Sequence, residues 1–384
     1  MSEIILFLPG NIFHSNVIQK KADRMLGERA GMDTLRKSKI PLVFAWQEID
    51  KLLAPDVYDP GHHELCAASL THALHNWLSP EHSRWQMDEG IKGIDVTFYP
   101  EFAPPSDPEL IPTKYFFLLA PQTVCYTHDS TTRTFGLPET FPEAPAIRFG
   151  SKVGILIHNR TLIDQSNQPK RSDRKTDDPI RDQWHNYLKD PAQGVDDLLR
   201  ATQGVAEQDG GVHIALGDLE TPYVHKVDAN ALWSEYLEAL DKQGLSSAFS
   251  PLKPHLSWFD EQAVDVQPPH RMLEKWTRHD AQLDYARRAY DDIKVSNPRE
   301  RWLLALARSS DVLSAMDSKI RKQKKETPPH AAKHREEIIK LGFTCLNILE
   351  GKEPLQALAT ADPLLGPRLL DILSSLPDDN GHQK

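Results

Sequence analysis

Proline is the residue type that most restricts how this chain can fold. The sequence contains 29 prolines among 384 residues, whereas an average protein has about 5% proline. Nine of them lie between Pro100 and Pro145. Because proline fixes φ and has no backbone N–H, it interrupts long helices and the inner strands of a sheet. This part of the chain therefore predicts short strands joined by irregular connections.

Short strand-like runs lie between and around these prolines. They are rich in aromatic and β-branched residues or alternate between polar and apolar residues, and they comprise Ile94–Tyr99, Lys114–Ala120, Thr123–His128 and Lys152–His158. We interpret residues 90–165 as a sheet with proline-edged connections. Near the N-terminus, Ile4–Leu8 predicts a strand, and a turn at Pro9–Asn11 and a helix over His14–Leu26 follow it.

The pattern changes at about residue 229, after which helical periodicity dominates. Apolar residues recur at steps of three and four over Met272–Ile293, Trp302–Ile320 and His334–Ile348. A shorter helix is predicted at about 363–376. Long helices joined by short breaks fold back on one another as antiparallel neighbours, so we expect a bundle.

The fold class predicted from these patterns is α+β, with a mainly antiparallel sheet followed by an all-α helical bundle. Residues 1–228 would form the α+β domain, with a polar loop at 165–181. Residues 229–376 would form the bundle, and residues 377–384 a polar tail.

Composition excludes a membrane protein of the helical kind. The longest purely apolar runs are Ile4–Leu8 and Phe116–Ala120, whereas a spanning helix needs about 20 apolar residues. The mean hydropathy of −0.50 agrees with this. Three widely spaced cysteines favour reduced thiols and a cytoplasmic location. The net charge of −10 disfavours a nucleic-acid footprint over the whole surface.

Histidine is the most abundant candidate for chemistry, and one segment concentrates it. Residues 61–79 read as a single helix in which Glu64, His72 and His75 share the polar face. One carboxylate and two imidazoles could bind zinc or manganese, or could act as acid and base. The same residues are also compatible with an ordinary solvated helix face, because the His-Glu-x-x-His motif is absent.

A second candidate pair is His213 and His255, each within a short apolar run. Phosphate-ester chemistry can use two imidazoles on neighbouring strands as acid and base, with hydroxyl groups that hold the phosphate. Here Ala215 occupies the place of one hydroxyl, so two ordinary strands are the alternative interpretation.

Two further groups of residues could bind partners. The aromatic residues Trp276, Tyr290 and Trp302 would contact a protein partner if the helical stripe stays open, and would otherwise belong to the bundle core. Two basic clusters could contact phosphate or nucleic acid, and are otherwise a loop and a solvated helix end: Lys170, Arg171 and Arg174, and Lys322, Lys324 and Lys325.

Taken together, these patterns favour a cytoplasmic interaction or adaptor protein whose helical half docks a protein partner. The alternative is a metal-assisted hydrolase that acts on phosphate esters or nucleic acid. In that case Glu64, His72 and His75 would be the first candidates for its site, and His213 and His255 the second.

Overall fold

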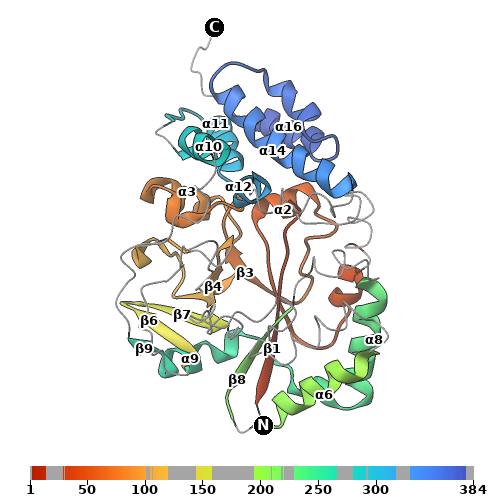
Figure 1. Cartoon of the computed structure of the whole chain (residues 1–384). Helices are drawn as coiled ribbons and strands as arrows, with labels where there is room; N and C mark the ends of the chain where they lie inside the picture. The colour runs from red at the N-terminus through yellow and green to blue at the C-terminus, as the bar shows by residue number, and fades with distance from the viewer. Residues whose placement is uncertain are drawn as a thin grey trace.

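The structure is a computed structural model that describes most of the strands and helices of the chain. The described residues are 2–13, 29, 31–100, 104–105, 107–119, 144–157, 194–208, 210–217, 219, 229–265, 280–290, 293–316 and 329–377. Figure 1 shows the whole molecule, with the strands at the end that holds the N-terminus and a group of helices at the opposite end.

The described residues form a nine-stranded sheet in the order β8-β1-β2-β3-β4-β5-β7-β6-β9. All neighbours from β8 to β7 are parallel, β6 is antiparallel to β7, and β9 pairs in parallel with β6. The strands are β1 (Glu3–Pro9), β2 (Leu42–Ala45), β3 (Glu64–Ala68), β4 (Ile94–Phe98), β5 (Tyr115–Leu119), β6 (Ala146–Phe149), β7 (Lys152–Ile157), β8 (Val212–Leu216) and β9 (Val264–Asp265).

The first two strands, β1 and β2, are buried on both faces, as is typical of a parallel sheet. Five consecutive residues of β1, Ile4–Leu8, are buried, and so are all four residues of β2. Parallel sheets are covered on both sides and so have continuous apolar strands, whereas an antiparallel sheet with one wet face alternates.

The sheet curls into a half-barrel, as the contact between Phe7 and Phe117 shows. Their ring centroids lie 4.3 Å apart, although three strands separate β1 from β5. In a flat sheet the two strands would lie about 19 Å apart at the usual strand spacing. The inner face of this half-barrel is apolar, and its core includes Ile5, Phe7, Val43, Ala45, Val96, Phe98, Phe117, Ile155 and Ile214.

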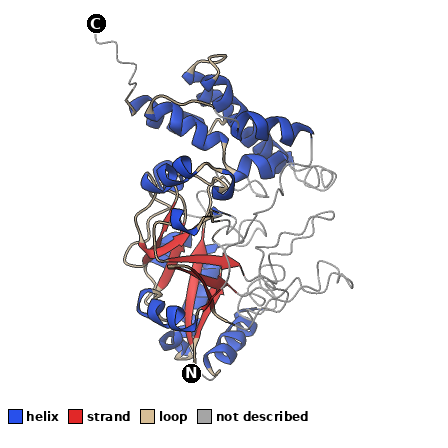
Figure 2. Ribbon diagram, turned by 90° about the vertical axis from the view of Figure 1, so that its left-hand side faces the viewer, coloured by secondary structure: helices blue, strands red, loops and turns tan. Residues whose placement is uncertain are grey.

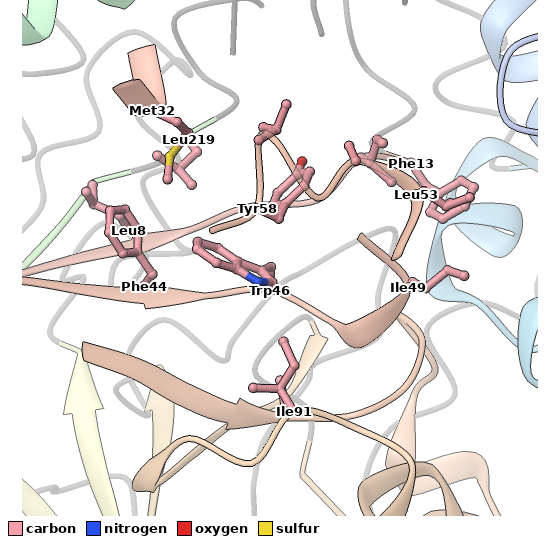
Figure 3. Packing of buried hydrophobic residues seen from close by; sticks show 14 of the residues in the cluster. Leu8, Phe13, Met32, Phe44, Trp46, Ile49, Leu53, Tyr58, Ile91 and Leu219 are labelled. Carbon is pink, nitrogen blue, oxygen red and sulfur yellow. The ribbon is translucent and has the colours of Figure 1, made fainter. Parts of the chain in front are cut away.

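Helices cover the outer face of the sheet. α6 (Gly194–Ala206) and α8 (Ala229–Lys242) pack beside β1, and α2 (Glu48–Leu53) follows β2. Figure 3 shows Phe44, Trp46 and Tyr58 side by side in this outer layer. The Trp46 ring centroid lies 5.3 Å from Phe44 and 5.4 Å from Tyr58. α3 (Pro80–Asp88) also belongs to the sheet part, whereas α9 (Leu256–Gln262) contributes Leu256 and Phe259 to the inner core.

The C-terminal helices form a cap beyond the carboxyl ends of the first strands (Figures 1 and 2). The cap comprises α10 (Asp280–Tyr290), α11 (Pro298–Ala307), α12 (Ser310–Met316), α14 (Pro329–Leu349), α15 (Leu358–Ala361) and α16 (Gly366–Ser375). Polar contacts join it to the segment after β3. The Ser310 N–H donates to the His72 carbonyl at 2.7 Å, and the Thr71 hydroxyl donates to the Ala305 carbonyl at 3.1 Å.

The prediction of a mainly antiparallel sheet followed by an all-α bundle is wrong. Pairing from β8 to β7 is parallel, and residues after 229 also contribute to the sheet part, because β9 pairs with β6 and α9 packs on it. The predicted helix over Trp302–Ile320 is interrupted after Ala307. Whether the chain divides into separate domains at residue 229 stays a prediction.

The predicted helix over residues 61–79 is also wrong. This segment forms β3, an irregular connection and a short 3₁₀-helix, His75–Trp77. Because the stretch from Cys66 to His75 is buried throughout, its apolar residues do not indicate one helix face. Strands β1, β4, β5 and β7 confirm four predicted strands: Ile4–Leu8, Ile94–Tyr99, Lys114–Ala120 and Lys152–His158. The other predictions fall outside the described residues, namely the strand Thr123–His128, the helix His14–Leu26 and the polar segments 165–181 and 378–384.

Substitution of Phe117 with Ala tests the curled sheet. Phe117 is fully buried and contacts a strand that is distant in the sheet, so its removal should lower the free energy of unfolding by about 3–5 kcal/mol. The control is Leu52→Ala, since Leu52 is 40% exposed, and it should cost less than about 1 kcal/mol. Urea unfolding measures the change in the free energy of unfolding for both variants, and equal changes would contradict the curled sheet.

Candidate functional site

Polar side chains gather where β1, β2 and β3 end and the cap begins. We call Asn11, Asp50, His72, Ser309 and Asp311 the edge cluster. Asn11 follows β1, Asp50 lies in α2 after β2, and His72 follows β3. Ser309 and Asp311 lie at the start of α12. Ligands of sheets with parallel strands commonly bind at this carboxyl edge, so the edge cluster is the candidate site.

Asp50 is the centre of the hydrogen bonding in the edge cluster. It is fully buried. Its carboxylate accepts hydrogen bonds from the Ile12 N–H at 2.9 Å, the Gln47 N–H at 2.9 Å and His72 Nε2 at 2.8 Å. Donation from Nε2 fixes the orientation and tautomer of the imidazole. Asp50 therefore positions His72 and holds two chain segments together.

Asp311 is the second carboxylate of the edge cluster. Its Oδ1 accepts from Asn11 Nδ2 at 2.8 Å and its Oδ2 accepts from the Ser309 hydroxyl at 3.0 Å. These bonds join the cap to the end of β1, because Asn11 directly follows that strand. Asp311 thus holds a fixed position relative to the sheet.

Asp311 and His72 line the same small pocket. Polar groups of Thr71 and Ser309 lie beside them, and the remaining lining residues are apolar and come from both the sheet part and the cap: Phe13, Ile49, Leu306, Val312, Ile338 and Leu341. The pocket has room for about one water molecule. A carboxylate and an oriented imidazole in an apolar surrounding can transfer protons to and from a bound group. The described part of the chain contains no group of three or more His, Cys, Asp or Glu placed to hold a metal ion.

The structure does not bring Glu64, His72 and His75 together. Glu64 begins β3, at the opposite end of the strand from His72. Its carboxylate accepts hydrogen bonds from the N–H groups of Leu252 at 2.6 Å and Lys253 at 3.1 Å. It therefore fixes the start of the 3₁₀-helix Lys253–His255.

His75 lies between α3 and the outer face of β4. Its Nδ1 lies 2.9 Å from the Ser83 hydroxyl, and its ring centroid lies 4.8 Å from that of Tyr99. Burial lowers the pKa of His75 to about 3 and raises the pKa of the Tyr99 hydroxyl. Both side chains are therefore neutral at neutral pH, and the catalytic role of His75 stays a prediction.

His213 and His255 do not share a site either. His213 is in β8 beside Ile4, and strand alternation puts it on the outer face with Ala215. His255 does not lie in a strand as predicted, because it is the last residue of the 3₁₀-helix that precedes α9. Its Nε2 lies 2.8 Å from the Ser250 hydroxyl and 3.0 Å from Glu3 Oε2, so it belongs to the opposite, amino-terminal edge of the sheet.

Where the structure describes them, the aromatic residues predicted to bind a partner pack in or against the core, Trp302 buried and Tyr290 half-buried. Trp302 is 6% exposed. The Tyr290 hydroxyl donates to the Arg308 carbonyl at 2.8 Å, and its ring lies 5.2 Å from that of Trp77. The other predicted partner and phosphate residues lie outside the described residues: Trp276, Lys170, Arg171, Arg174, Lys322, Lys324 and Lys325.

The sequence patterns overlooked Asn11, Asp50 and Asp311. Asn11 and Asp50 are early polar residues after buried strands, a position that indicates a site only if the strands are known to be parallel. Asp311 follows the sequence Arg308–Ser310, a polar interruption within a predicted helix. That interruption was the available signal for a break at the site.

Comparisons with known proteins identify the fold. No protein-family model matches the sequence, and no curated protein matches it. The structure is similar to a GH57 branching enzyme from Thermococcus kodakaraensis, crystallised with glucose, with a TM-score of 0.50, 12% identity and coverage of 98% of this chain and 97% of that one. A GH57-type branching enzyme from Pyrococcus horikoshii has a TM-score of 0.49 and 10% identity, with coverage of 98% of this chain and 95% of that one. An exo-type maltose-forming amylase from Pyrococcus sp. ST04 has a TM-score of 0.37 and 12% identity, with coverage of 97% of this chain and 73% of that one.

The chain thus has a curled, mostly parallel half-barrel with helices, as in GH57 glycoside hydrolases. The predicted adaptor function, with its docking bundle, is wrong, and so is the alternative of a hydrolase for phosphate esters or nucleic acid. The finding that overturns both is the fold, which is similar to that of the branching enzyme from Thermococcus kodakaraensis over 98% of this chain. None of the described helices is long and apolar enough to cross a membrane.

The buried imidazole of His75 should make the protein sensitive to acid. Its pKa is about 3 in the folded protein and about 6.5 in the unfolded chain. Between these two pH values, the His75 imidazole therefore binds a proton only in the unfolded chain. The free energy of unfolding therefore falls as pH decreases below 6.5, by about 1.4 kcal/mol per pH unit. In His75→Asn, the decrease in the free energy of unfolding between pH 7 and pH 5 should be smaller than in the wild type by about 2 kcal/mol. Urea unfolding at both pH values measures it, and an unchanged difference would be evidence against a neutral buried His75.

Substitution of Asp50 with Asn tests the centre of the edge cluster. The amide has one acceptor oxygen for three donors, and its NH₂ group would face one of them. We expect the free energy of unfolding to fall by about 2–4 kcal/mol. Asp88→Asn, at an exposed position in α3, is the control and should change it by less than about 0.5 kcal/mol. Similar denaturation midpoints for the two variants would show that Asp50 does not hold the site together.

Proposed function

We propose that the protein is a carbohydrate-active enzyme that cleaves or transfers a glycosidic bond in a glucose-containing substrate. The observation that carries this proposal is the position of Asp311 and His72, which line one pocket at the carboxyl edge of the half-barrel. Similarity to the fold of a branching enzyme crystallised with glucose supports it. Because one fold can host many activities, the residues of the site have to carry the assignment.

The edge cluster offers the two kinds of group that glycosidic bond cleavage requires. A carboxylate stabilises the positive charge that develops on the sugar, and a proton donor neutralises the oxygen that leaves. Asp311 would supply the carboxylate, and His72, as the imidazolium, would supply the proton from Nδ1 while its Nε2–H stays bonded to Asp50 at 2.8 Å. The C–O bond breaks as the leaving oxygen takes that proton. A water or an acceptor hydroxyl then adds to the sugar and returns a proton to the imidazole.

The apolar surroundings favour this chemistry. Phe13, Leu306 and Val312 line the pocket beside the polar groups. Electrostatic interactions are stronger where water is excluded. Hydrogen bonds from Asn11 and Ser309 fix the Asp311 oxygens in advance, which reduces the reorganisation needed during reaction.

A cytoplasmic location belongs to the same proposal. Its support is the odd number and wide spacing of the cysteines, of which Cys66 and Cys345 are buried free thiols in the described structure. Such thiols are typical of a reducing compartment.

The test is activity on soluble starch and maltooligosaccharides, followed as new reducing ends and as a changed chain-length distribution. The wild-type protein should alter one of these, and Asp311→Asn should lower the rate by at least about 100-fold. Asp371→Asn, at an exposed position in α16 of the cap, should retain full activity. Equal rates for Asp311→Asn and wild type would remove Asp311 from the reaction, and an inactive wild type on all glucans would overturn the proposal.

A further inference from the structure

The cap packs mainly on itself. Each cap helix makes its most extensive contacts with other cap helices, and α14 is the helix on which α11 and α12 pack. Among the described elements, every strand and every helix of the sheet part precedes Asp280, where the cap begins. The described chain therefore passes from the sheet part to the cap once, between Asp265 and Asp280. The contacts that the structure describes across the rest of this boundary are noncovalent.

Hydrogen bonds that water could replace connect the cap to the sheet part. The Arg308 guanidinium donates to His82 Nδ1 of α3 at 2.9 Å, and the Arg368 guanidinium donates to the Leu53 carbonyl at the end of α2. Further bonds across the boundary join three pairs: Asn11 and Asp311, Ser310 and His72, and Thr71 and Ala305. Because water pairs with both groups after separation, each such bond contributes little net free energy to closure. A boundary that is partly polar allows the two parts to move relative to each other.

The pocket of Asp311 and His72 lies at this boundary. Apolar residues of both parts line it, such as Phe13 from the sheet part and Val312 from the cap. This lining favours the closed arrangement, because closure removes it from water. The pocket has room for about one water molecule, whereas a glucose unit is many times larger. A sugar can therefore reach Asp311 and His72 only after the cap and the sheet part separate.

We propose that the cap is a lid that opens at this boundary to admit a sugar and closes over it for the reaction. Asp311 moves with the cap, whereas His72 stays with the sheet part, so the carboxylate and the imidazole meet only in the closed state. Closure also excludes water from the reacting groups. The choice of a sugar as the ligand rests on the proposed function, whereas the movement of the cap can be measured without any ligand.

Hydrogen exchange of single amides under native conditions tests the movement. The Ser310 N–H donates across the boundary to the His72 carbonyl at 2.7 Å, whereas the Arg308 N–H donates to the Leu304 carbonyl at 3.0 Å within the cap. If the cap opens as a unit, the Ser310 amide is exposed while the Arg308 amide keeps its bond. After correction for intrinsic rates, we expect the Ser310 amide to exchange at least about 100-fold faster than the Arg308 amide.

Two arginines provide a matched pair of variants in the full-length protein. Arg368→Ala removes a bond across the boundary, whereas Arg299→Ala removes bonds to the Leu373 and Leu376 carbonyls, at 2.9 and 3.1 Å, inside the cap. In Arg368→Ala, loss of a charged donor should raise the open population, and with it the exchange rate of the Ser310 amide, about tenfold. Stopped-flow tryptophan fluorescence should show that maltotriose associates faster by the same factor. Arg299→Ala should lower Tm and leave both rates unchanged.

Two results would overturn the lid without affecting the proposed function. Equal protection of the Ser310 and Arg308 amides in the wild type would show that the boundary opens only when the cap unfolds. Faster exchange of the Ser310 amide in Arg368→Ala, with an unchanged association rate of maltotriose, would show that opening does not admit the sugar. A wild type that neither binds nor cleaves any glucan would instead overturn the proposed function, while a difference between the two amides would still establish the movement of the cap.

Discussion

The stacking of Phe7 on Phe117 is the contact on which the rest of the structure depends. It joins two strands that three others separate, so the parallel sheet has to curl around a shared apolar interior. Once the strands are parallel and curled, their carboxyl ends converge at one mouth. Residues that follow β1, β2 and β3 then meet there, although up to 61 positions of sequence separate Asn11 from His72.

Asp50 converts this convergence into a fixed geometry. Its carboxylate holds the segment after β1, the start of α2 and the imidazole after β3. The cap attaches to the same place through Asp311 and the carbonyl of His72. The edge cluster is therefore both the seam between sheet and cap and the place where a carboxylate and an imidazole face one pocket. These two roles are compatible, because a site that positions reacting groups needs rigid support.

The sequence predicted the buried strands well, since runs such as Ile4–Leu8 and Lys152–His158 are short, apolar and β-branched. It could not predict how they pair, because parallel pairing depends on contacts between distant segments, such as Glu3–Phe7 with Val212–Leu216. The prediction of a helix over residues 61–79 was wrong for a related reason. When all sides of a segment are buried, its apolar residues show no periodicity that distinguishes a helix from a strand. Of the predicted site residues, His72 lies in the edge cluster, whereas Glu64 and His75 lie elsewhere. Asp50 carried no local signal, and the signal near Asp311 was the polar interruption Arg308–Ser310 within a predicted helix.

The most direct test of the account is a crystal structure of the protein soaked with maltotriose. The account predicts a sugar at the carboxyl edge of the half-barrel, with its oxygens about 3 Å from Asp311 and His72. A sugar bound at the amino-terminal edge, near Glu64 and His255, would contradict it. So would an empty mouth at sugar concentrations that support turnover.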